Sequence, residues 1–415
     1  MTIIPQTDFP DSTIAFLLYG YDFISRTCEK KNSDIFKTRL LLQKFFCMKG
    51  QEAAAVIYNT GFFERKGAAP GRLKHTLFGK GGVQGLDGER HRARKSLFIS
   101  MLKPEQLGCL TQLFWEQLYL YAKKWESQEE VVLFDDFEEI LCRAVCGWVG
   151  VPIRDDEVAF RTRQFSSIID SSGAVGPRHW RGIRARKRVD SWLRSLLKKV
   201  RRGQLRIPES WILHKIAFYR EPNGSLLDIR AAAVELNNVL RPTIAVARFI
   251  VFEALAIHDY KGIAKKLRNA HDDYVKWFVQ EVRRFYPFFP FVVAKVKKDF
   301  EWRGYQFPRG RKVLLDLYGT DHDPRIWENP QEFCPERFKN WNGGAFNFIP
   351  QGGGDHLENH RCPGEWVTIE LMKNAAKFLT RTISYEVPKQ DLSISHSRIP
   401  AQPKSRFKIR NVRVL

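Results

Sequence analysis

One of the seven cysteines, Cys362, lies in a glycine-rich loop that limits which ligands this chain can fold around. The loop contains three consecutive glycines at 352–354, and the cysteine is followed by Pro363, Gly364 and a helical apolar pattern at 365–378. Glycines let a backbone approach a flat ligand closely, and the amide donors at a helix N-terminus favour a thiolate. Such a thiolate is suited to be a nucleophile, a redox thiol or an axial metal ligand, and a buried unreactive thiol is the alternative.

Two charged motifs precede this loop in the sequence. Glu281 and Arg284 are three residues apart on a predicted helix and can form an ion pair, and Arg337 lies in the sequence Pro-Glu-Arg-Phe. These two motifs and the glycine-rich cysteine loop, in that order, resemble the cytochrome P450 superfamily of haem-thiolate enzymes. The resemblance implies that Cys362 is the axial ligand of the haem iron. It further implies that Glu281, Arg284 and Arg337 form a buried ion triad beneath the haem.

An arginine and a proline occur within the long apolar helix predicted at 226–258, for which Ser225 is the expected N-cap. A buried guanidinium is costly unless an anion pairs with it, so Arg241 pairs either with a structural carboxylate or with a substrate carboxylate. Pro242 cannot donate a hydrogen bond to the carbonyl four residues back, and we expect the helix to kink there. The superfamily usually has an acid followed by an alcohol here, to deliver protons. In this sequence Arg241 and Pro242 replace the acid, and only Thr243 remains.

The Arg-Pro pair resembles the bacterial fatty-acid peroxygenases of the P450 superfamily. Further stretches resemble this group nearly from end to end, at residues 77–79, 82–88, 173–180, 279–284 and 315–319. The resemblance implies one mainly α-helical P450 domain over residues 1–415, with haem b as cofactor and hydrogen peroxide as co-substrate, and no dedicated reductase. It implies that Arg241 holds the carboxylate of a long-chain fatty acid. That carboxylate would act as acid–base while the α carbon, or alternatively the β carbon, is hydroxylated.

The residues that the resemblance places along the acyl channel are Leu77, Phe78, Ile169, Phe288 and Phe289. The residues that it places at the haem propionates or the haem edge are Arg65, His91, Lys95 and His360. Gln84, which completes the candidate catalytic set with Arg241 and Pro242, stands where relatives that form terminal alkenes often have His. Gln84 therefore favours hydroxylation over alkene formation. Phe289 is bulky where a β-hydroxylating relative has Gly, which resembles the α-selective members. The alternatives are ordinary pocket packing for Gln84 and Phe289, and surface solvation for the residues at the haem.

Half of the formal net charge of +22 lies in one short segment. Residues 178–206 contain twelve of the 68 Lys and Arg residues and a single acid, Asp190. Apolar residues at 192–200 recur at helical spacing, which predicts an amphipathic surface helix. A solvated helix face is the favoured interpretation, and contact with an anionic membrane surface or partner is the second. Specific nucleic-acid binding is the least favoured, because no nucleic-acid motif accompanies the charge.

Three other functions are alternatives to fatty-acid hydroxylation. The same centre could decarboxylate fatty acids to terminal alkenes. A P450 monooxygenase served by separate ferredoxin partners is the second alternative, and the replacement of the proton-delivering acid by Arg241 and Pro242 argues against it. The third, from another class, is a basic binding protein that scaffolds on nucleic acid or on a membrane.

The remaining features indicate a cytoplasmic, mainly helical protein. Seven cysteines without a Cys-x-x-Cys motif argue for reduced thiols, and the N-terminus lacks the basic region of a secretory signal. No apolar run approaches the about 18–20 residues of a membrane span. The predicted helices cover 103–125, 129–148, 271–286 and 365–378. The predicted strands cover 291–302, 313–317, 383–387 and 407–414.

Overall fold

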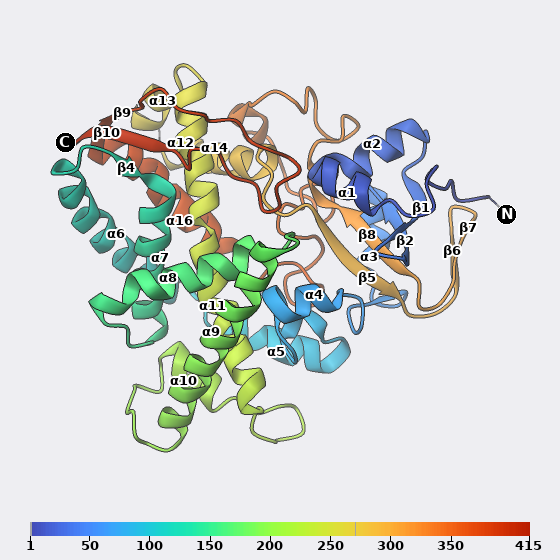
Figure 1. The fold of residues 1–415 in the computed structure, drawn as a ribbon, viewed down its shortest axis with the longest axis horizontal. Helices are drawn as coiled ribbons and strands as arrows, with labels where there is room; N and C mark the ends of the chain where they lie inside the picture. The colour runs from blue at the N-terminus through green and yellow to red at the C-terminus, as the bar shows by residue number, and fades with distance from the viewer. Residues whose placement is uncertain (1, 270) are drawn as a thin grey trace.

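The computed structural model describes residues 2–269 and 271–415, which form a large helical body with a smaller sheet region beside it (Figure 1). The prediction of a mainly helical fold with a minor β portion is confirmed. The longer helices are α5 (Gly88–Ser100), α6 (Pro104–Glu126), α7 (Leu133–Val149), α8 (Asp155–Asp170), α9 (Pro177–Arg201), α11 (Ile229–Ala245), α12 (Ala247–Asp259), α14 (Asp272–Phe285) and α16 (Glu365–Lys377). The shorter helical segments are α1 (Thr13–Tyr19), η1 (Gly20–Asp22), α2 (Phe23–Lys30), α3 (Gln51–Ile57), α4 (Gly71–Leu73), η2 (Lys74–Phe78), η3 (Val83–Gly85), α10 (Ile212–Ala217), α13 (Ile263–Asn269), α15 (Leu317–Asp321), η4 (Pro335–Phe338) and η5 (Phe378–Thr382).

The main sheet has the strand order β1-β2-β8-β5-β3, and a second sheet has the order β4-β10-β9. Strand β2 runs parallel to β8, and the other neighbours in the main sheet are antiparallel. The strands are β1 (Ile35–Leu40), β2 (Gln43–Met48), β3 (Phe63–Glu64), β4 (Val131–Val132), β5 (Phe291–Val296), β6 (Phe300–Trp302), β7 (Tyr305–Phe307), β8 (Lys312–Asp316), β9 (Ile383–Glu386) and β10 (Lys408–Val414). The predicted strands at 291–302, 313–317, 383–387 and 407–414 correspond to β5 with β6, β8, β9 and β10.

Strands β1 and β2, which the sequence did not predict, meet at a turn that carries no turn signal. Leu41 and Leu42 form this turn with φ angles of 50° and 62°, a conformation that Gly, Asn or Asp usually adopts. The backbone N–H of Leu42 donates to Asp11 Oδ2 at 2.7 Å, and that of Leu41 donates to Thr13 Oγ1 at 2.6 Å. A distant segment therefore supports the turn, and local sequence does not reveal it.

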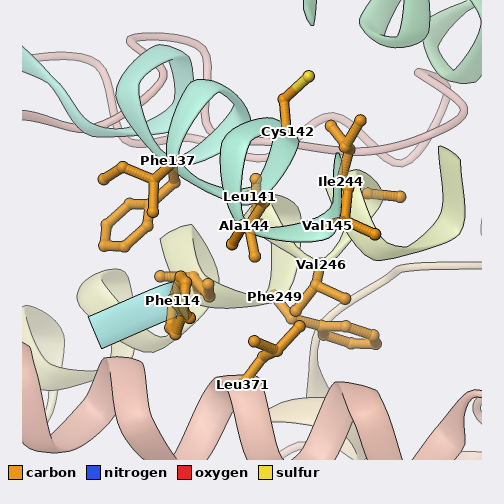
Figure 2. Packing of buried hydrophobic residues seen from close by; sticks show 14 of the residues in the cluster. Phe114, Phe137, Leu141, Cys142, Ala144, Val145, Ile244, Val246, Phe249 and Leu371 are labelled. Carbon is orange, nitrogen blue, oxygen red and sulfur yellow. The ribbon is translucent and has the colours of Figure 1, made fainter. Parts of the chain in front are cut away.

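The main hydrophobic core lies between α7, the junction of α11 with α12, and α16, as Figure 2 shows. The buried side chains that meet there include Leu141, Ala144, Val145, Ile244, Val246, Phe249 and Leu371. Helix α11 crosses the centre of the molecule (Figure 1). Its position in the core fixes the residues of its last turns, which include Arg241.

The single helix predicted at 226–258 is wrong, because the structure has two helices there. Helix α11 ends at Ala245 and α12 begins at Ala247. The break falls at Val246, whose N–H donates to the carbonyl of Thr243 at 3.2 Å, and the helix continues through Pro242 itself. The predicted kink is thus displaced by one turn from the proline.

The N-cap of α11 is Asp228, and the prediction of Ser225 is wrong. The Asp228 carboxylate accepts the N–H groups of Arg230 at 2.9 Å and Ala231 at 3.2 Å. The Ser225 hydroxyl instead donates to Asn223 in the preceding turn. The cap satisfies two of the four donors that a helix N-terminus leaves without partners.

Replacing Asp228 with alanine is expected to lower the free energy of unfolding by about 1 kcal/mol, because two N–H groups lose their acceptor. Ser225→Ala is the matched control and is expected to change it by less than about 0.5 kcal/mol. Urea unfolding followed by far-ultraviolet circular dichroism measures both. A larger loss for Ser225→Ala than for Asp228→Ala would contradict the assignment.

Helix α9 carries most of the basic segment and has two distinct faces. Leu193, Leu197 and Val200 are buried against the body. The exposed cations of the segment are Arg181, Arg184, Lys187, Arg188, Lys198, Lys199, Arg202 and Arg206. Arg178, Arg194 and Arg201 are half-buried, and Arg186 is buried, with only 3% of it exposed. Within the described residues, no helix is long and apolar enough to cross a membrane.

Asp316 ends β8 and is buried where α15 begins. Its carboxylate accepts the hydroxyl of Ser25 at 2.7 Å and the N–H of Gly319 at 2.8 Å. Burial raises the pKa of this carboxyl from 3.8 to about 6, and the two hydrogen bonds oppose the rise without cancelling it. The folded protein therefore binds a proton here more tightly than the unfolded chain does.

The contribution of Asp316 to the free energy of unfolding is expected to be lost as the pH rises from 3.8 to about 6. An asparagine does not ionise, and it can accept the N–H of Gly319 through Oδ1 while its Nδ2 donates to the hydroxyl of Ser25. Asp316→Asn is thus expected to be more stable than the parent protein above pH 6, by about 1–3 kcal/mol, with a smaller difference near pH 4. Urea unfolding at a series of pH values tests this. Parallel pH profiles for the two proteins would contradict it.

Candidate active site

Cys362 lies at the end of the glycine-rich loop, immediately before α16. Its N–H donates to the carbonyl of Gln351 at 3.0 Å, which closes the loop. A side chain at Gly353 would come within 2.7 Å of the Ala345 carbonyl oxygen, so this glycine also serves the packing of the loop itself. Burial raises the pKa of the Cys362 thiol, and the N–H of Gly364 opposes that rise. Additional positive charge next to the sulfur, such as a metal ion, would favour the thiolate.

Glu365, in the first turn of α16, connects the cysteine loop to α14. It accepts Nε of Arg361 at 2.7 Å, lies 3.0 Å from Nε2 of His356, and pairs with the buried Arg283. Arg283 also donates to Oε1 of Gln351 at 3.0 Å. Burial raises the pKa of the Glu365 carboxyl, but Arg283 and the other donors lower it more, so the net pKa lies well below the usual range. No sequence motif indicated this network, and its one local signal is an acid three residues after the cysteine.

Glu281, Arg284 and Arg337 form a buried ion group that joins α14 to η4. Arg284 donates to both Glu281 oxygens at 2.7 Å, and Nε of Arg337 donates to Oε1 of Glu281 at 3.1 Å. The N–H of Cys334 donates to the same oxygen at 2.8 Å. Arg284 also donates to the carbonyl of Pro330 at 2.9 Å. The three charged side chains named in the sequence analysis therefore lie in one connected group, and Glu281 and Arg284 have no exposed surface.

Arg65, His91, Lys95 and His360 lie together beside the cysteine loop. The rings of His91 and His360 are 3.9 Å apart, and Nζ of Lys95 donates to backbone carbonyls of the loop. Nε2 of His360 is 3.8 Å from a carboxylate oxygen of Asp87. Arg65, His91 and Lys95 are buried and His360 is half-buried, so surface solvation does not describe them.

Arg65 and Lys95 bring positive charge to this cluster, whereas burial favours the neutral form of its two histidines. Burial is the largest cause that lowers the pKa of Lys95 to about 8, of His91 to about 4 and of His360 to about 3. Burial also lowers the pKa of Arg65. Such a cluster favours an anionic ligand, because an anion offsets the cost of burying the positive charges.

The donor set around Cys362 fits haem. The described residues contain no group of three His, Cys, Asp or Glu side chains that could hold a metal ion. One thiol can therefore bind a metal here only if the metal brings other ligands with it. Haem does so, and its two propionates match the positive charges of Arg65 and Lys95 and the ring N–H groups of the neighbouring histidines.

Arg241 points from α11 to the carbonyl of Leu77 in η2, to which its Nη1 donates. Its Nη2 lies 3.4 Å from Oδ1 of Asn238. Only 5% of Arg241 is exposed, and within the described residues no carboxylate lies within ion-pair distance of it. Burial, and after it the charge of Arg186, lower the pKa of Arg241 to about 9, although the charges of Asp190 and Cys362 oppose this. Arg241 therefore has no structural carboxylate as a partner among the described residues, which leaves a substrate carboxylate as the remaining possibility from the sequence.

Gln84 connects to Arg241 through Asn238. Nδ2 of Asn238 donates to Oε1 of Gln84 at 3.2 Å and to Oε2 of Glu235 at 2.7 Å. Glu235 is fully buried and pairs with Nη1 of Arg94 at 2.5 Å. No sequence motif pointed to Asn238, Glu235 or Arg94. The pair of Arg94 and Glu235 is 141 residues apart in the chain, which no local pattern reveals.

The apolar residues assigned to the acyl channel do not all lie in one cluster. Ile169 is buried in the main core, and Phe288 packs against that core with its ring 4.1 Å from the ring of Phe249. Phe289 instead packs against the hydrophobic cluster of the sheet region. Leu77 and Phe78 belong to η2, beside Arg241. The adjacent residues Phe288 and Phe289 therefore pack against two different hydrophobic clusters.

Pro242 and Thr243 follow Arg241 within α11. Pro242 has no N–H, so the carbonyl of Asn238 receives no hydrogen bond from it. The Thr243 hydroxyl donates to the carbonyl of Val239 at 2.9 Å. The Thr243 hydroxyl is thus bonded to the backbone of its own helix, and the two residues before Thr243 are not acids.

A family model described as cytochrome P450 matches residues 268–399. Among solved structures, cytochrome P450SP alpha (CYP152B1) in complex with (R)-ibuprophen is 48% identical with a TM-score of 0.96, and the match covers 98% of this chain and 100% of that chain. Cytochrome P450EX alpha (CYP152N1) with myristic acid is 41% identical with a TM-score of 0.97, over 100% of both chains. A variant of cytochrome P450 OleT in complex with arachidonic acid is 34% identical with a TM-score of 0.97, over 100% of this chain and 99% of that one.

The curated relatives are more distant. Protopanaxadiol 6-hydroxylase from Panax ginseng is 24% identical over 315 residues, which are 68% of this chain and 66% of that protein. Psoralen synthase from Pastinaca sativa is 31% identical over 121 residues, which are 28% of this chain and 25% of that protein. The chain thus spans about two thirds of the first curated relative and about a quarter of the second.

Proposed function

Because the chain belongs to the cytochrome P450 family, and within it to the fatty-acid peroxygenase group, we propose that it hydroxylates long-chain fatty acids with hydrogen peroxide. The proposed position of attack is the α carbon. The observation that carries the proposal is Arg241, a guanidinium that is buried in the core without a carboxylate within ion-pair distance among the described residues.

Arg241 is suited to hold a substrate carboxylate. Its guanidinium offers parallel donors that match a carboxylate in a bidentate pair. Its present acceptors are a backbone carbonyl and an amide oxygen, which are neutral. A carboxylate in their place would offset the burial of the positive charge, which is the largest cause that lowers the pKa of Arg241. An anion is therefore the favoured ligand at this position.

Cys362 would bind the haem iron, and Arg65, His91, Lys95 and His360 would face the propionates. When bound, haem supplies the redox-active iron that activates peroxide. The Glu365 network holds the loop that carries Cys362, through Arg361 and Arg283. The charge of Cys362 acts on Arg241, so the thiol and the carboxylate anchor lie within electrostatic reach of each other.

A carboxylate on Arg241 would supply the acid–base group that this chain lacks at the usual position. Pro242 has no N–H and Thr243 donates to its own helix, so neither offers a proton-carrying acid. Asn238 contacts both Gln84 and Arg241 and would keep the guanidinium oriented. When Arg241 anchors the carboxylate, the α carbon is the chain carbon next to the anchored group, and positioning therefore favours hydroxylation at that carbon.

The ligands of the similar structures support a fatty-acid substrate. Cytochrome P450EX alpha was solved with myristic acid and the OleT variant with arachidonic acid. Both ligands combine one carboxylate with a long apolar chain. In this chain the apolar residues Leu77, Phe78, Ile169 and Phe288 would line the path of the acyl chain, and Phe288 is better placed for this than Phe289 because it faces the core around α12.

The test is product analysis by mass spectrometry after the haem-loaded protein is mixed with myristic acid and hydrogen peroxide, without reductase or reduced nicotinamide. We expect α-hydroxymyristic acid as the main product. A terminal alkene as the main product would favour decarboxylation by the same site. Products that form only when a reductase system is added would contradict the proposal.

A further inference from the structure

Arg186 is buried, whereas most other cations of the same helix lie on its solvent-exposed face. It belongs to α9, and 3% of it is exposed. Its Nε donates to Oδ1 of Asp190 at 2.8 Å. Its Nη2 is buried and has no hydrogen-bond partner. A fully buried donor without a partner is uncommon and calls for a functional or structural reason.

Arg186 reaches the same carbonyl as Arg241. Its Nη1 donates to the carbonyl of Leu77 at 2.9 Å and to that of Thr76 at 3.2 Å. Nη1 of Arg241 donates to the Leu77 carbonyl as well. Two buried guanidinium groups, from α9 and α11, therefore meet at one backbone oxygen of η2.

Gly79 makes room for this arrangement. A Cβ atom at this position would lie 2.2 Å from Nη2 of Arg186 and 2.8 Å from a methyl carbon of Val234. The guanidinium of Arg186 thus fills the space where a side chain at position 79 would stand. Gly79 also has a φ of 78°, a conformation that other residues rarely adopt.

Resting on the function proposed above, we propose that Arg186 is a positioning residue of the carboxylate site. It keeps the Leu77 carbonyl satisfied, so that Arg241 is free to turn its donors to the carboxylate of an incoming fatty acid. Its positive charge also makes the site prefer an anionic lipid to a neutral one of the same length.

Two physical arguments support this role. When Arg241 turns to a carboxylate, the Leu77 carbonyl would lose its hydrogen-bond donor unless Arg186 continued to donate to it, and an unsatisfied buried carbonyl is costly. The charge of Arg186 also acts unfavourably on Arg241, and Asp190 compensates only in part. An anion between the two cations relieves this repulsion, whereas a neutral head group does not.

The test compares Arg186→Gln with the matched control Arg188→Gln, which removes the same charge from the exposed face of the same helix. The measured quantities are the dissociation constants of myristic acid and of the alcohol of the same chain length. Both are followed by the change in haem absorbance, and KM and kcat for peroxide-driven turnover are measured as well. For Arg186→Gln we expect the dissociation constant of the acid to rise about tenfold, that of the alcohol to change less than about twofold, and KM to rise more than kcat falls. Arg188→Gln should change neither constant.

Equal weakening of acid and alcohol in Arg186→Gln would show a purely structural role, and no change in either would also overturn the inference. If Arg186→Gln does not fold, Arg186→Lys keeps the charge and is expected to keep the preference for the acid. A loss of that preference in the lysine variant would contradict the electrostatic role. Arg241→Gln in the same assays separates the two proposals, because unchanged turnover there would overturn the proposed function itself, whereas unchanged Arg186 variants alone would not.

Discussion

Replacing Arg241 with glutamine is expected to lower the peroxide-driven turnover of myristic acid by about 10³-fold. The variant loses both the anchor of the carboxylate and, with it, the acid–base group that the substrate supplies, and positioned acid–base catalysis contributes about 10²–10⁴-fold. Haem should remain bound, because Arg241 lies on α11 and not in the cysteine loop. Turnover is measured as product formed per haem at saturating peroxide.

The matched control for this change is Arg230→Gln. Arg230 lies on the same helix, is exposed, and is remote from the contacts of Arg241. The control should change turnover by less than about twofold, since an exposed charge contributes little. Full activity in the Arg241 variant, with haem content unchanged, would mean that the substrate carboxylate is held elsewhere.

Replacing Glu281 with glutamine is expected to lower the free energy of unfolding by about 3–5 kcal/mol. The change leaves Arg284 without its buried counter-ion and also removes the charge that Arg337 contacts. Breaking a buried ion pair by removing one partner costs this much because the remaining charge is uncompensated. Urea unfolding of the haem-loaded protein, followed by circular dichroism, measures the loss.

Glu336→Gln is the control for the Glu281 change, because Glu336 pairs with Lys266 on the surface near the same motif. Exposed pairs contribute about 0–1 kcal/mol. The control should therefore leave the unfolding midpoint nearly unchanged. Similar effects of the two changes would show that the buried ion group is not a stability centre.

Sequence motifs located those residues of the site that lie close together in the chain. Glu281 and Arg284 are one helical turn apart, and Cys362 lies between glycines and a helix, so local patterns and a family resemblance identified them. The contacts that complete the site join distant segments. Glu365 with Arg283, and Glu235 with Arg94, pair across 82 and 141 residues, and pairing at such separation leaves no mark in one sequence.

Two local features escaped prediction, and the physical reason differs between them. The turn at Leu41 and Leu42 depends on Asp11 and Thr13, and apolar residues there resemble a continuous apolar run. Asp228 rather than Ser225 caps α11, although both residue types are good caps. The donors to Asp228 are its own neighbours in the chain, so here two local signals compete and no distant contact decides between them.

The net charge of the chain requires two different explanations. Eight of the twelve cations of the basic segment are exposed, six of them on α9 and two just beyond its end, as the amphipathic pattern predicted. Arg186 departs from this pattern, and its burial became visible only when α9 was placed against η2. A count of charges therefore describes the surface of the helix and misses the one cation that reaches the candidate site.

The central claim is that a carboxylate held by Arg241 supplies the acid–base group for peroxide. The most direct measurement is the peroxide-driven oxidation of a neutral substrate, such as an alkyl arene without a carboxylate, with and without a short carboxylic acid in the buffer. We predict negligible turnover without the acid, a rise of at least about tenfold with it, and no rise in Arg241→Gln. Equal turnover of the neutral substrate with and without the acid would contradict the account.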